Sequence, residues 1–219
     1  MKLVIISGAT RPKSKSNTAK IIQAFQKGYE ESGNTTEVYY LSERRQWAAA
    51  KKAFHENTEI LIALPLYVEN IPGILLEFLS GAESKKTSGT RLSFLLQGGF
   101  PEGSQSRCCE AFLEGLPEQL GCEYGGTLIK GDMFGVGLVD EKTRSKMLAP
   151  FVEMGRTFAQ SGGFKKSVAD KFAAPEYMSK GQILMFRLFG RQISRFFMRH
   201  IAKGLGCKEK LDARPFGRG

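Results

Sequence analysis

The chain has 219 residues, a length that suits one large domain or one domain with an appendage. Its 42% hydrophobic and 25% charged residues are typical of a globular protein and exclude a mostly disordered or collagen-like chain. The net charge of +10 is concentrated late in the chain, because residues 164–219 hold 13 basic and 4 acidic side chains. We therefore expect a nearly neutral body over residues 1–163 and a basic extension over residues 164–219, joined at Gly162-Gly163.

The cysteine count and the lack of long apolar segments indicate the compartment. Four cysteines are too few for the disulfide framework of a small secreted domain, and they favour a reducing environment. The apolar run at residues 3–6 is shorter than the core of a signal peptide, and arginines interrupt the most apolar late segment. We expect a cytoplasmic protein without a transmembrane helix. No metal site is predicted, because His55 and His200 have no partner at ligand spacing.

Apolar runs of the strand type alternate along the chain with segments of helical periodicity. The expected strands cover residues 3–7, 36–41, 59–65, 91–97 and 123–129. The first expected helix begins within residues 16–18 and ends within residues 32–34. The other expected helices cover residues 45–55, 72–79, 104–120, 140–160 and, in the extension, 182–203. In the 104–120 helix we expect Cys108, Phe112, Leu116 and Leu120 to share one apolar side.

The strand runs are continuous rather than alternating, as in strands that are buried on both faces of a parallel sheet. Five such strands, each followed by a helix, predict an open, doubly wound five-stranded parallel sheet of the α/β class. Ligands of such sheets bind outside the carboxyl ends of the strands. The loops after the first, third and fourth strands are therefore the candidates for a site.

The loop after the first strand, residues 7–18, contains neither the G-x-G-x-x-G nor the Walker A pattern. It supplies hydroxyls, an amide and cations just before a helix N-terminus, where free N–H groups and the helix dipole attract an anion. Ser16, Asn17 and Thr18 can bind phosphate oxygens there. The alternative is that Ser16 or Asn17 only caps the helix.

The other two loops have the composition of ring-binding segments. Residues 65–72 run between two prolines and carry Tyr67 among apolar neighbours, which suits one wall of a flat ring. Gly98-Gly99 after the fourth strand permits close backbone approach to a ligand. Ordinary loop packing and a simple turn are the alternatives. Together the three loops would bind a phosphate, place an aromatic side chain against a flat ring and let the glycine backbone approach that ring closely. Flavin mononucleotide (FMN) requires all three.

The pattern Ser7-Gly8-x-x-Arg11-x-x-Ser14-x-Ser16-Asn17-Thr18, followed by Pro65-Leu66-Tyr67 and Gln97-Gly98-Gly99, resembles the flavodoxin-like NAD(P)H-dependent oxidoreductases, that is, the FMN reductase family with its iron-sulfur flavoprotein relatives. The resemblance covers roughly residues 1–160 and implies a flavodoxin-like fold. It also implies that residues 10–18 hold the FMN phosphate, that residues 65–68 flank the isoalloxazine and that residues 98–100 lie near its polar edge. The expected cofactor-binding residues are Ser7, Thr10, Arg11, Ser14, Ser16, Asn17, Thr18, Pro65, Leu66, Tyr67, Val68, Asn70, Gln97, Gly98, Gly99 and Phe100.

By the same resemblance, the protein would be an FMN-containing NAD(P)H oxidoreductase and a homodimer, and would pass electrons to a flavin, a quinone or a similar small acceptor. The chemistry would be that of FMN, so no catalytic side chain is expected. An iron-sulfur cluster is not expected, since no cysteine precedes Cys108. Two alternatives stay open: a flavodoxin-like electron carrier or flavin-binding module without substrate turnover, and a noncatalytic interaction protein.

The basic extension has a helical pattern with two kinds of side chain. Arg187, Arg191, Arg195, Arg199 and Lys203 recur at every fourth residue, and phenylalanines and isoleucines occupy much of the remaining surface. The pattern suits packing of the apolar side on the body or on a second subunit, with the arginines in solvent. It also suits peripheral binding to an anionic membrane, to an acidic partner or to the phosphates of NADPH. Nucleic acid is not expected, because no nucleic-acid-binding motif accompanies the charge.

Overall fold

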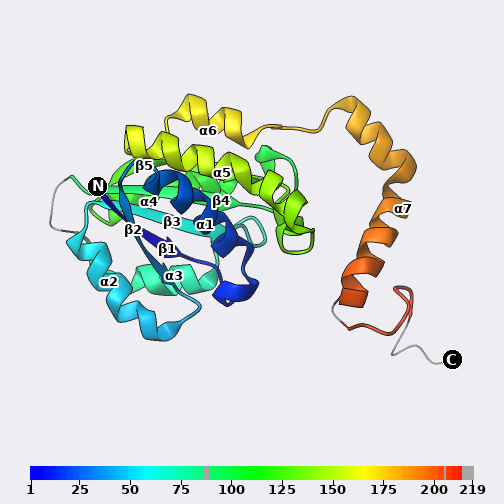
Figure 1. Ribbon diagram of the computed structural model, residues 1–219, viewed down its shortest axis with the longest axis horizontal. Helices are drawn as coiled ribbons and strands as arrows, with labels where there is room; N and C mark the ends of the chain where they lie inside the picture. Colours follow the sequence, from blue (N-terminus) through cyan, green and yellow to red (C-terminus); the bar gives the residue numbers. More distant parts are fainter. Residues whose placement is uncertain (86–88, 205, 214–219) are drawn as a thin grey trace. The chain divides into compact units, whose positions relative to one another are not determined.

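The structure is a computed structural model that describes residues 1–85, 89–204 and 206–213. One sheet of five parallel strands forms its centre, in the order β2-β1-β3-β4-β5 (Figure 1). The strands are β1 (Lys2–Ser7), β2 (Thr35–Tyr40), β3 (Glu59–Pro65), β4 (Arg91–Gln97) and β5 (Glu123–Lys130). The middle strands β1, β3 and β4 are buried along almost their whole length, as their continuous apolar runs predict. The predicted doubly wound α/β fold is confirmed.

Helices cover both faces of the sheet (Figure 1). One face is covered by α1 (Asn17–Glu30), α5 (Glu141–Ser161) and α6 (Lys166–Ala173). The other is covered by α2 (Trp47–Glu56), α3 (Gly73–Ser80) and α4 (Arg107–Gln119). Each face has its own apolar core, because alternate side chains of the buried strands point to opposite faces.

Two glycines bring α1 and α5 into backbone contact. A Cβ placed on Gly28 of α1 would lie 1.8 Å from the carbonyl oxygen of Val152, and one placed on Gly155 of α5 would lie 2.1 Å from that of Phe25. The ring of Phe25 also meets that of Phe158 edge-on, with centroids 5.6 Å apart. The contact fixes α1, and therefore its N-terminus, relative to the sheet.

The buried side of α4 is not the predicted one. Cys109 and Leu113 are buried, whereas Cys108 is exposed and Phe112 is 44% exposed. A repeat of exactly four residues drifts around a helix, because four residues turn it through more than 360°. The buried set at 109, 113, 116 and 120 combines steps of four and three and therefore stays on one side. The helix also begins later than expected, at Arg107, after the 3-10 turn Gly103–Ser106.

The chain divides into two compact units, Met1–Tyr177 and Met178–Gly219. The first unit extends beyond Gly162-Gly163, because α6 packs against β5 and adds Ala169 to the core. Lys130 at the end of β5 supports this packing: its Nζ donates to the carbonyl oxygen of Phe172 at 3.0 Å. Burial lowers the pKa of this ammonium group.

The second unit contains α7 (Lys180–Gly204), which covers the helix expected at residues 182–203. None of the described side chains of α7 is buried. Within the described ranges, no helix combines the length and the apolar composition that crossing a membrane requires.

Candidate functional site

A cavity of about 510 Å³ opens at the carboxyl ends of β1, β3 and β4, within the size range of small-molecule sites. This is the point where the order of strands reverses, with β2 on one side of β1 and β3 on the other. The cavity is lined by Ala9, Arg11, Ser16, Asn17, Thr18, Pro65, Leu66, Tyr67, Val68, Glu69, Gln97, Gly99, Phe100, Gln105 and Phe134. All three loops that the sequence singles out contribute to it.

One end of the cavity is formed by the start of α1. Ser16 is the N-cap of this helix, and its Oγ accepts a hydrogen bond from the backbone N–H of Ala19 at 3.2 Å. The cap uses the hydroxyl only as an acceptor, so its hydrogen can still be donated to a ligand. Arg11 makes no ion pair with any of the described residues, and the first turn of α1 carries no acidic side chain. This end of the cavity is therefore suited to an anion.

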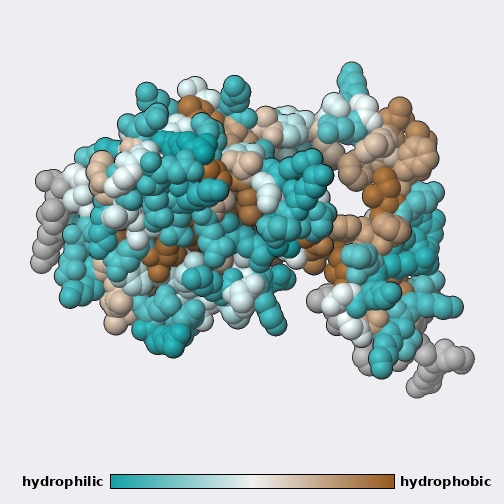
Figure 2. Space-filling model, in the orientation of Figure 1, coloured by the Kyte–Doolittle hydropathy of each residue, from teal (hydrophilic) through white to brown (hydrophobic). Residues whose placement is uncertain are grey.

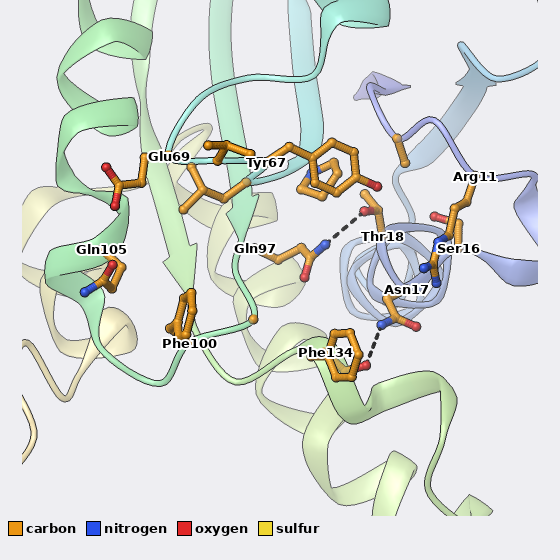
Figure 3. Close-up of a pocket in the computed structure, with 15 residues that line it drawn as sticks. Arg11, Ser16, Asn17, Thr18, Tyr67, Glu69, Gln97, Phe100, Gln105 and Phe134 are labelled. Carbon is orange, nitrogen blue, oxygen red and sulfur yellow. Dashed lines mark hydrogen bonds between the residues drawn. The ribbon is translucent and has the colours of Figure 1, made fainter. Parts of the chain in front are cut away.

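Asn17 has a structural task that the sequence did not indicate. Its Nδ2 donates to the carbonyl oxygen of Met133 and to that of Phe134, each at 3.0 Å; Figure 3 shows the second of these bonds. Both amide hydrogens are thus engaged, and the group that Asn17 can still offer to an anion is its backbone N–H. The two bonds hold the segment after β5 against the start of α1. They place Phe134 at the cavity, where the sequence predicted no lining residue.

Gln97 at the end of β4 joins the fourth strand to the same helix. Its Nε2 lies 3.4 Å from the Oγ1 of Thr18, and both side chains are buried. Gly98, the next residue, uses both of its backbone groups inside the protein: its N–H donates to the carbonyl oxygen of Lys130, and its carbonyl accepts from the N–H of Met133, each at 2.9 Å. Gly99 and Phe100, rather than Gly98, therefore face the cavity.

The loop after β3 folds into a tight reverse turn. Tyr67 and Asn70 exchange two backbone hydrogen bonds, at 3.0 and 3.1 Å, and Val68 and Glu69 between them have φ of 50° and 62°. Positive φ is unfavourable for a β-branched residue such as valine, so the flanking contacts must impose the turn. One such contact joins the hydroxyl of Tyr67 to the Oγ1 of Thr10, 3.3 Å apart. The turn leaves the Val68 side chain 99% exposed at the rim of the cavity.

Aromatic rings stand on two sides of the cavity. Figure 3 shows Tyr67 on one side and Phe100 and Phe134 on the other, with the start of α1 at one end. Glu69 and Gln105 lie at the end away from α1. The arrangement is a slot with rings along its walls and an anion-binding end, which suits a flat ring system that carries a phosphate.

The structure brings most of the expected residues to the cavity, but not all of them. The expected residues that do not line it are Ser7, Thr10, Ser14, Asn70 and Gly98. The hydroxyl of Ser7 is buried at the end of β1 without a hydrogen-bond partner. The Oδ1 of Asn70 accepts from the N–H of Ile71 at 2.7 Å and so supports the reverse turn.

Four lining residues were not predicted: Ala9, Glu69, Gln105 and Phe134. The first two lie inside loops that the sequence had already singled out, so the loop was identified but not the residue. Phe134 follows the fifth strand, whose end the switch-point rule does not select. Across the described residues, no group of three or more His, Cys, Asp or Glu side chains is placed to hold a metal ion.

Comparison with known proteins relates this arrangement to solved structures. No model of a protein family matches the sequence, and no curated protein matches it. An NAD(P)H:quinone oxidoreductase from Methanothermobacter marburgensis superimposes with a TM-score of 0.57 at 15% identity, covering 72% of this chain and 98% of its own. An FMN-dependent NADH-azoreductase from Bacillus anthracis str. Ames Ancestor, in complex with FMN, gives a TM-score of 0.53 at 16% identity over 74% of this chain and 99% of its own. At such identities the likeness shows the fold alone, and the chain has the flavodoxin-like fold of these oxidoreductases.

Proposed function

We propose that the protein is an FMN-dependent NAD(P)H oxidoreductase that passes electrons from a nicotinamide to a flavin, a quinone or a similar small acceptor. The observation that carries this proposal is the cavity at the switch point, which joins the start of α1 to a slot with aromatic rings on two sides. The flavodoxin-like fold and the oxidoreductases that share it support the same conclusion.

The residues of the cavity fit FMN. The hydroxyls of Ser16 and Thr18, the first backbone N–H groups of α1 and the guanidinium of Arg11 would hold the phosphate. The isoalloxazine would lie between Tyr67 and the rings of Phe100 and Phe134. The donors and the cation at the phosphate end suit an anion, and the ring-lined slot suits a flat heterocycle.

When bound, FMN supplies a ring that accepts a hydride from a nicotinamide and passes the electrons on. The chain itself binds and orients that ring. Tyr67 and Phe100 would flank the ring, while part of the rim stays open to a second substrate. No side chain has to act as a nucleophile, so the reaction needs no catalytic residue from the chain.

The decisive measurement combines a visible spectrum with nicotinamide oxidation. We expect the protein, after incubation with FMN and gel filtration, to show flavin absorbance and to oxidise NADH or NADPH faster than the same concentration of free FMN. Bound flavin without nicotinamide oxidation would favour the alternative, an electron carrier or flavin-binding module. A spectrum without flavin bands after reconstitution would contradict both functions and favour a noncatalytic interaction protein.

We further propose that the protein is a homodimer whose second subunit covers part of the rim of the cavity, at Val68 and Phe100, and leaves the rest open to the second substrate. Val68 and Phe100 stand at that rim and are 99% and 69% exposed. We expect sedimentation at micromolar concentration, with FMN bound, to give twice the chain mass of 24.2 kDa. Val68→Lys should shift the equilibrium towards monomer, whereas Phe112→Lys on the exposed side of α4 should leave it unchanged. A 24.2 kDa species for the unaltered protein would contradict the proposal.

A further inference from the structure

Helix α7 has a composition unlike that of the rest of the chain. Its 25 residues include six basic side chains and no Asp or Glu. The whole second unit, residues 178–219, carries ten basic and two acidic side chains, whereas residues 1–177 carry 22 and 20. The helix is therefore a concentrated positive segment attached to a nearly neutral body.

The arginines of α7 and one set of its apolar side chains lie on opposite sides of the helix. Phe186, Phe189, Ile193 and Phe196 follow one another at steps of three, four and three residues, which places them on one side of a helix. The arginines at 187, 191, 195 and 199 follow at steps of four and occupy the other side. In Figure 2 this segment shows brown apolar residues beside teal basic ones.

Both sides of α7 carry exposed side chains. The four apolar side chains are between 47% and 77% exposed, and no described side chain of α7 is buried. Among the described residues, the one ion pair of the arginine side joins Arg195 to Asp212, 3.7 Å apart and in solvent. Such a pair contributes little. Like charges at a spacing of four residues also repel one another along the helix, so the arginine side lacks compensation.

A partner that covers both sides of α7 must offer negative charge to the arginines and an apolar region to the phenylalanines. A second copy of α7 could cover the apolar side but would add an equal positive charge. The body, with almost equal numbers of acidic and basic groups, has no comparable excess of negative charge. A bilayer with anionic headgroups meets both requirements, because phosphates face the arginines and the acyl chains accept the phenylalanines.

We propose that α7 is an amphipathic helix that lies in the interface of an anionic lipid membrane. Phe186, Phe189, Ile193 and Phe196 enter the acyl boundary, and the arginines reach the headgroups. The long aliphatic stems of the arginines let their guanidinium groups stay at headgroup level while the helix axis lies lower. The proposal concerns α7 alone and does not depend on the proposed enzymatic function.

The test is flotation of the full chain with lipid vesicles. We expect binding to vesicles of phosphatidylcholine mixed with phosphatidylglycerol, no binding to phosphatidylcholine alone, and loss of binding as salt is raised. Arg187→Gln with Arg191→Gln should weaken binding on the order of 25-fold, since each basic side chain near such a surface contributes about fivefold. The matched control is Lys142→Gln with Lys146→Gln, which removes two exposed charges at the same spacing from α5 and should change binding little.

A second pair of variants tests the apolar side. Phe189→Ser with Ile193→Ser should abolish flotation, whereas Phe112→Ser on α4 should not. Circular dichroism and the melting temperature should show that each variant is still folded. Failure of the unaltered protein to float at low salt would overturn the proposal, as would equal losses in the lysine control. If the protein does not float and the Phe189/Ile193 variant lowers its oligomeric mass, a second copy covers the apolar side, and the proposal is wrong.

Discussion

Replacing Gly28 by Ala is expected to lower the free energy of unfolding by about 3 kcal/mol, the upper end of the usual cost of overpacking. The new Cβ would lie 1.8 Å from the carbonyl oxygen of Val152 and 2.7 Å from its carbonyl carbon. Backbone atoms cannot turn aside as a side chain can, so α1 and α5 would have to separate. Urea unfolding at equilibrium, followed by circular dichroism, measures the change.

A glycine elsewhere in the fold provides the control. Gly115 lies on the exposed side of α4, and a Cβ placed there would have no atom within 4 Å. Gly115→Ala should therefore raise the free energy of unfolding by about 0.5 to 1 kcal/mol, because alanine favours a helix over glycine. Gly155→Ala, on the α5 side of the contact, should behave like Gly28→Ala. A neutral or stabilising Gly28→Ala would show that the two helices do not touch.

The strands could be predicted because their continuous apolar sequences fit only strands that are buried on both faces. A run such as Ile60-Leu61-Ile62-Ala63-Leu64 has no polar side to expose, so it must be covered on both faces. With helical segments between such runs, a parallel sheet with right-handed crossovers follows. The contact of Gly28 with α5 could not be predicted, because in the sequence Gly28 looks the same as Gly115, where an added Cβ would have no atom within 4 Å.

The end of the first unit and the buried side of α4 were also hard to predict, because both depend on partners that lie far away in the sequence. The segment that forms α6 is short and contains two lysines, with a third just before it, so its sequence resembles a solvent-exposed linker. Its place in the fold depends on Ala169 and on the bond from Lys130 to Phe172, partners that lie far away in the sequence. Leu116 belongs to both the predicted and the observed apolar side of α4, so it does not distinguish them. Contact with the sheet decides which side is buried.

Part of the cavity could likewise be predicted from the sequence and part could not. Topology places the ends of β1, β3 and β4 together, so the loops at residues 7–18 and 65–72 and the glycine pair at 98 and 99 could be named in advance. Phe134 could not, because the amide of Asn17 holds it there from 117 residues away. The reverse turn after β3 also gave no signal: Val68-Glu69 is not a turn sequence such as Asn-Gly, and its two positive φ values are imposed by the surroundings.

The phosphate end of the cavity gives the prediction with the largest effect on binding. Ser16→Ala combined with Thr18→Val should weaken FMN binding by about 150-fold or more, since each of the two hydrogen bonds to a charged group contributes about 1.5 to 3 kcal/mol. Riboflavin has the same ring without the phosphate, so its binding should change little. Titration of flavin fluorescence with the unaltered protein and the variant gives both dissociation constants, and the ratio between the two flavins isolates the phosphate.

The loss of a helix cap must be separated from the loss of a phosphate donor. Ser16→Ala removes the bond to the N–H of Ala19, which costs about 1 kcal/mol of stability by itself. Asp140→Ala removes the equivalent cap of α5, where Oδ1 accepts from the N–H of Thr143 at 3.0 Å, and Asp140 does not line the cavity. This variant should lose similar stability while keeping the FMN-to-riboflavin ratio of the unaltered protein. If the Ser16/Thr18 variant loses both flavins equally, its hydroxyls do not hold the phosphate, and the start of α1 is a capped helix end and nothing more.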